Sequence, residues 1–126
     1  MKNETLETEG GGMFGLSIAQ WSQEVHRLAK EKGWHDDRQS EDAYVERMCN
    51  NFHDEVCELH EAWRNNELHE QCGKPIDLTC LEEELADIVI RVFDSAARLG
   101  VDIERAIEIK HSHNLIRPKR HGGKRS

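Results

Sequence analysis

Residues 79–99 read TCLEEELADIVIRVFDSAARL, the most apolar helical pattern in the chain. Thr79 with Glu82 three positions later is the capping-box pattern that opens a helix. Apolar residues then recur at helical spacing as far as Leu99, and Gly100 supplies the stop that ends many helices. The spacing predicts a helix that is apolar around most of its circumference and is therefore the most buried helix of the chain.

Outward from this stretch, three further helices are predicted from their caps and apolar spacing, and they follow Ser17, Ser40 and Asp102. Trp21 and Trp63 lie on the apolar stripes of the first two, so we expect both in the core. The segment 65–78 contains a glycine and a proline and is predicted to be a loop. Because no segment has the alternation of a strand, we expect an all-α protein, a four-helix bundle.

Length and composition favour a single small domain. A chain of 126 residues with 37% hydrophobic residues can form one core but has little apolar material for it, so a homo-oligomer, either dimer or tetramer, is expected. We place the helical domain at residues 13–117, between a flexible N-terminal tail at 1–12 and a basic flexible tail at 118–126.

Charge and cysteine spacing exclude several classes of protein. A net charge of −8 argues against a nucleic-acid binder, which needs a basic face. The four cysteines match neither a zinc site nor a disulfide framework, so we expect free thiols. No signal-peptide pattern and no run of about 18 apolar residues is present, which predicts a cytoplasmic protein without a membrane partner.

Two acidic tetrads mark the candidate site. Glu55 and Glu58 lie at the edge of the apolar stripe of the second helix, and Glu84 and Asp87 lie similarly on the third. Residues three apart share a helix face, so two such helices side by side would form a cage of four carboxylates. Like charges so close would raise each other's pKa without a cation. Oxygen ligands without thiolate or imidazole predict Mg²⁺, with Mn²⁺ as a second choice, rather than zinc.

The fourth helix adds polar residues to this picture. Its inward stripe should continue through Lys110, Asn114 and Arg117. Either the helix leaves the core there and these residues face water, or they line a polar cleft beside the cage that suits triphosphate oxygens.

These motifs together resemble the MazG-like members of the all-α NTP pyrophosphatase superfamily. The family has ExxE on one helix, a loop, ExxD on the next helix, and then a helix with Lys and Asn. The corresponding segments here are 54–59 (DEVCEL), 84–88 (ELADI) and 110–117 (KHSHNLIR). The short, single-domain MazG-like proteins also have features similar to 58–63 (ELHEAW), 73–75 (GKP) and 114–124 (NLIRPKRHGGK), and the match covers most of residues 17–123.

The resemblance implies a Mg²⁺-dependent hydrolase acting on acid anhydrides, a nucleotide pyrophosphohydrolase. It would convert a ribo- or deoxyribonucleoside triphosphate to the monophosphate and pyrophosphate, as in nucleotide-pool house-cleaning. The four carboxylates would be metal ligands and catalytic groups, one of them serving as general base. The predicted substrate contacts are Lys110, Asn114 and Arg117 for phosphate or sugar, Trp34 as an aromatic base contact and Lys74 for phosphate.

Two alternatives stay open from the residues alone. A di-iron carboxylate bundle needs Glu-x-x-His on two helices, and only Glu108 with His111 fits that pattern cleanly. A non-enzymatic helical interaction or regulatory module would keep its acids as a solvated face. Trp34 has a second interpretation as well, because a Trp can close the end of a core.

Overall fold

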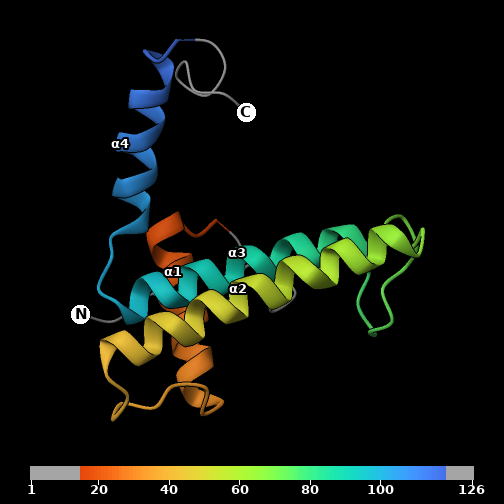
Figure 1. Cartoon of the computed structure of the whole chain (residues 1–126), viewed down its shortest axis with the longest axis horizontal. Coiled ribbons are helices and arrows are strands. Elements are labelled where there is room, and N and C mark those ends of the chain that lie inside the picture. Colours follow the sequence, from red (N-terminus) through yellow and green to blue (C-terminus); the bar gives the residue numbers. More distant parts are fainter. Residues whose placement is uncertain (1–14, 119–126) are drawn as a thin grey trace.

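The computed structural model describes residues 15–118, in which the chain forms four helices and no β-strand. In chain order they are α1 (Ile18–Glu31), α2 (Glu41–Arg64), α3 (Cys80–Arg98) and α4 (Ile103–Leu115) (Figure 1). The predicted all-α class is confirmed. The predicted tail 1–12, and the predicted tail 118–126 beyond Pro118, lie outside the described residues.

Each helix begins at the predicted cap. The side chains of Ser17, Ser40, Thr79 and Asp102 accept hydrogen bonds from backbone N–H groups in the first turns of α1, α2, α3 and α4. Thr79 and Glu82 form the predicted capping box. Such caps satisfy donors that the helix itself leaves without partners, which is why short polar residues fix the starting points so firmly.

The packed body consists of three helices, and α3 contacts both α1 and α2. The fourth helix contacts α1 and extends away from the α2–α3 pair (Figure 1). No residue of α4 is buried. In the single chain, therefore, α4 does not close a bundle around the other three.

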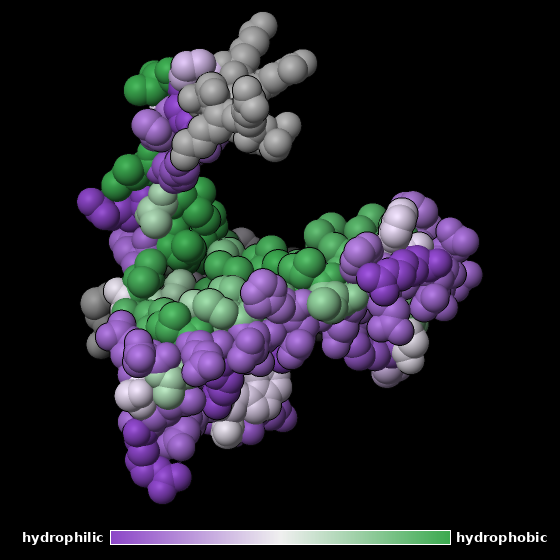
Figure 2. Space-filling model, in the orientation of Figure 1, coloured by the Kyte–Doolittle hydropathy of each residue, from purple (hydrophilic) through white to green (hydrophobic). Residues whose placement is uncertain are grey.

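As predicted, α3 has more buried residues than any of the other three helices, but α3 and α2 are incompletely covered. Leu85 and Val89 of α3 are exposed, because α1 and α2 cover only part of this apolar helix. Trp63 is 59% exposed and Trp21 36%, so the prediction that both belong to the core of the chain is wrong. Figure 2 shows hydrophobic surface running along α3 and onto the inner side of α4. Among the described residues, no large side chain is fully buried.

The predicted loop between α2 and α3 has local order of its own. An isolated antiparallel bridge joins Gln71 to Thr79, and Cys72 N–H donates to the carbonyl of Leu78 at 2.9 Å. This hairpin-like turn brings Lys74 back beside the first turn of α3. All four cysteines are free thiols, as predicted. Between residues 15 and 118, no helix is long and apolar enough to cross a membrane.

Candidate functional site

The structure brings the four predicted carboxylates together. Glu55 and Glu58 from α2 and Glu84 and Asp87 from α3 each offer an oxygen, and these oxygens lie within 4.8 Å of one another. Glu55 is buried, Glu84 and Asp87 are half-buried, and Glu58 is exposed. The cluster therefore opens to solvent on the side of Glu58.

Burial and mutual repulsion disturb the titration of the cluster. Burial, followed by the nearby charge of Glu58, raises the pKa of Glu84 above its ordinary value. Burial and the charge of Glu55 likewise raise the pKa of Asp87 and that of Glu58. Lys74 opposes the shift at Glu84 and Asp87 but does not cancel it. A bound cation would remove this conflict.

Arg91, which the sequence analysis missed, ties this cluster to an aromatic side chain. Its Nε donates to Glu55 Oε1 at 2.9 Å, and its guanidinium lies 5.6 Å from the centroid of the Trp34 ring. The ion pair compensates the charge of Glu55, which is only 8% exposed. Arg91 thus pairs with Glu55 of the cluster and lies over one face of Trp34, the predicted base contact.

Lys74 is paired with Glu83, an acid that was not among the predicted site residues. Its Nζ donates to the carboxylate of Glu83, a buried residue that precedes Glu84. The Lys74 side chain is itself 63% exposed. Glu83 therefore anchors a cation at the edge of the cluster, and the predicted phosphate contact of Lys74 stays a prediction.

The donor set fits a hard divalent cation. All four groups in the cluster present carboxylate oxygen, which Mg²⁺ and Mn²⁺ prefer. Glu84 Oε2 is buried and has no hydrogen-bond partner within residues 15–118. An unsatisfied anionic oxygen in such a place is costly unless a cation or a donor meets it.

A cavity of about 180 Å³ adjoins the cluster. One end is formed by Glu55, Glu58 and Asp87, and Trp34 forms part of the wall. The remaining lining residues are Val25, Ala29, Ile90, Arg91 and Asp94. The cavity thus combines an acidic end with apolar and aromatic walls, which is the usual composition of a small-molecule site.

A second polar cluster, centred on Asp94 in the lining of the same cavity, was also missed. Asp94 Oδ1 accepts from His26 Nδ1 at 2.8 Å and from His35 Nε2 at 2.7 Å. One sequence signal marks it in retrospect: Glu84, Asp87, Arg91 and Asp94 are spaced by three, four and three residues, which is one face of a helix.

The residues predicted on the fourth helix are not brought to this site. Lys110 and Asn114 are exposed on α4, and Arg117 follows that helix, half-buried. None of the three lines the cavity in the single chain. The half-site of the di-iron alternative, Glu108 and His111, lies on α4 as well and takes no part in the carboxylate cluster.

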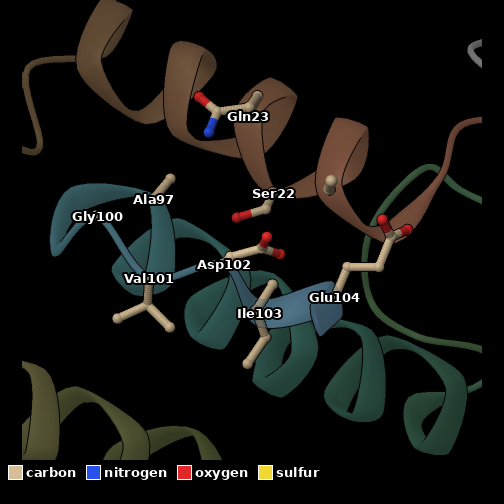
Figure 3. A pocket seen from close by; sticks show the side chains of 9 residues that line it. Ser22, Gln23, Ala97, Gly100, Val101, Asp102, Ile103 and Glu104 are labelled. Carbon is tan, nitrogen blue, oxygen red and sulfur yellow. The ribbon is translucent and has the colours of Figure 1, made fainter. Parts of the chain in front are cut away.

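A larger cavity, of about 370 Å³, lies between α1 and the start of α4 (Figure 3). Its acidic groups include Asp102 and Glu104, and Figure 3 shows Asp102 beside Ser22. Asp102 and Ser22 already have structural partners. Asp102 accepts a hydrogen bond from Arg105 N–H and so caps α4, and Ser22 donates a hydrogen bond to the Phe93 carbonyl. This cavity therefore lacks the converging ligands of the acidic site.

Comparison of the chain with protein-family models, curated proteins and solved structures gives no match.

Proposed function

We propose that this chain is a Mg²⁺-dependent nucleoside triphosphate pyrophosphohydrolase of the MazG-like type, releasing a nucleoside monophosphate and pyrophosphate. The observation that carries the proposal is the group of four carboxylates from α2 and α3, whose oxygens lie within 4.8 Å of one another at the end of a cavity with an aromatic wall. An acidic protein needs cations between itself and a triphosphate, and this group is suited to hold them.

Three of the four carboxylates have distinct settings in the proposal. Glu55 is held by Arg91, and Glu84 has a buried oxygen that is ready to bind. Glu58 is the exposed member, so it is the one best placed to meet substrate or water. Bound Mg²⁺ would neutralise the triphosphate, orient it, and lower the pKa of water. The raised pKa values of Glu58, Glu84 and Asp87 also make one of them a candidate proton acceptor.

Substrate groups are assigned by charge and shape. Trp34 offers an indole face for a base, and Lys74 places a cation near the phosphate end. The hydrolysis breaks the bridge between the α and β phosphates, and positive charge beside it stabilises the leaving pyrophosphate.

We further propose that the protein works as a homo-oligomer. Leu85 and Val89 on α3 and Ile107 and Ile109 on α4 are exposed apolar side chains, more than a small monomer needs to leave in water. Packing of a second copy against them would cover α3 and provide a place for α4. In such an assembly Lys110, Asn114 and Arg117 would approach the triphosphate from a neighbouring copy.

Product analysis tests the proposed activity. The protein is incubated with ribo- and deoxyribonucleoside triphosphates and Mg²⁺, and the nucleotides are separated by ion exchange. We expect monophosphate and pyrophosphate, lost in Glu58→Gln and retained in the matched control Glu61→Gln, an exposed acid on the same helix. Diphosphate with orthophosphate would show cleavage of the wrong bond. No turnover, together with a melting temperature indifferent to Mg²⁺, would favour the helical interaction module.

A further inference from the structure

Asp94 differs from every other acid that lines the acidic cavity. Of the four acids in the lining, it alone is outside the four-carboxylate group. It lies on α3 and is 8% exposed. Its Oδ1 accepts two hydrogen bonds, from His26 and His35. Its Oδ2 accepts none from the residues that the structure describes. In the lining of the cavity, Asp94 Oδ1 is thus bonded to the two histidines, and Oδ2 is available as an acceptor.

The two histidines fix the orientation of this carboxylate. The side chain of His35 is only 3% exposed, and its Nδ1 is buried without a partner among residues 15–118. A proton on that nitrogen would be a buried donor with nothing to bond, so the favoured tautomer carries its proton on Nε2 and donates it to Asp94. His26 can donate from Nδ1 in the same way. The carboxylate is therefore held in place before any ligand arrives.

The size of the cavity limits what it can take. A cavity of about 180 Å³ is smaller than the sites of about 300 to 1,000 Å³ that enclose drug-sized molecules. It has room for a planar ring system rather than a whole nucleotide. Asp94 lies seven residues after Asp87 on α3, which is about 10 Å along the helix at a rise of about 1.5 Å per residue. The base of a triphosphate held by the metal-binding acids would therefore point towards Asp94.

The chemistry of Asp94 selects among bases. A carboxylate oxygen only accepts hydrogen bonds, so the group that meets it must be a donor. The exocyclic amino group of cytosine or adenine is such a donor, and carboxylates read cytosine in this way. The oxo group at the same position of uracil or hypoxanthine would face the carboxylate with a second acceptor, which is repulsive.

We propose that Asp94 is a specificity-determining residue that accepts a hydrogen bond, through Oδ2, from the exocyclic amino group of the substrate base. This inference rests on the proposed function, because it assigns the base to the cavity beside the carboxylate group. It predicts a preference for amino-bearing over oxo-bearing bases of equal ring size.

Two substrate pairs test the inference, CTP against UTP and ATP against ITP. We expect the amino member to have the higher kcat/KM in the pair that is turned over faster. In Asp94→Asn, the carbonyl can still accept from both histidines while an NH₂ group replaces Oδ2. The preference should then fall by about tenfold or more, since a hydrogen bond to a charged group is lost and a donor replaces an acceptor. Asp37→Asn, an exposed acid-to-amide change, should leave it unchanged.

Binding of CMP and UMP in the absence of metal, measured by calorimetry, separates the two possible failures. If no triphosphate is hydrolysed but CMP binds more tightly than UMP, the proposed reaction is wrong and the role of Asp94 stands. Hydrolysis with equal or reversed preference in the wild type, or with a preference that Asp94→Asn leaves unchanged, overturns the role of Asp94. If Asp94→Asn does not fold, the test uses the wild-type protein and a pyrimidine nucleotide that lacks the 4-amino group. We expect this nucleotide to bind more weakly than CMP.

Discussion

Replacement of Glu84 by Gln should stabilise the metal-free protein while destroying its response to Mg²⁺. The substitution keeps the shape of the side chain but removes its charge. Its buried Oε2 has no partner within the described residues, and both burial and the charges of Glu58 and Asp87 raise its pKa. The folded state therefore carries an electrostatic conflict at this residue that the unfolded chain does not.

The size of the effect follows from the geometry. Two unit charges whose oxygens lie within 4.8 Å of one another repel by about 3.5 kcal/mol or more at an effective dielectric constant of about 20. Solvent at the exposed Glu58 and the opposing charge of Lys74 reduce this, and we expect a net gain of about 1 to 2 kcal/mol in the free energy of unfolding. For a chain of this size that corresponds to a rise of about 3 to 10 °C in Tm.

The assay is thermal unfolding in chelator and in Mg²⁺, followed by circular dichroism. The wild type should gain Tm on addition of Mg²⁺, because a ligand of the folded state stabilises it. Glu84→Gln should begin higher in chelator and gain little. Glu61→Gln, which removes an exposed acid of α2, should behave like the wild type. A lower Tm for Glu84→Gln in chelator would contradict the prediction, since it would mean that the charge at this position stabilises the fold.

Three further predictions follow from the same structure. Because the pKa values of the cluster are raised, the folded protein binds protons at these carboxylates more tightly than the unfolded chain does. Their contribution to stability therefore falls as pH rises from the ordinary Glu value of 4.5 through the raised values. The Tm of the metal-free protein should be higher at about pH 5 than at about pH 8, and Mg²⁺ should reduce that difference. Arg91→Met leaves the buried Glu55 without its cation and should cost about 3 kcal/mol in chemical denaturation, whereas a loss below about 0.5 kcal/mol would show that the pair is not formed in solution. Val89→Glu places a charge on the exposed apolar face of α3 and should shift the mass from light scattering towards that of the monomer, whereas an unchanged mass would show that this face does not hold the copies together.

The sequence specified the local elements well because their signals are local. Ser17 and Thr79 each cap a helix with their own side chain, so nothing distant is needed to place those starting points. The exposure of Trp63 could not be read in the same way. An apolar stripe in the sequence shows that one face of a helix is apolar. Which element covers that face depends on the packing of helices that are distant in sequence. In the single chain, residues 15–118 leave more than half of the Trp63 side chain exposed.

The site shows the same division between local and distant information. The four acids were found because each pair repeats at three-residue spacing beside an apolar stripe. Arg91 and Asp94 continue that face of α3 but were hidden by their apolar neighbours, and their partners lie 36 and 59 or more residues away in sequence. One polar line on α3 therefore serves two purposes: its first half faces the carboxylates of α2, and its second half faces the histidines of α1 and of the turn that follows. If α3 is the common support, a change at Arg91 should affect both the metal response and the discrimination between bases, whereas a change at His26 should affect the discrimination alone.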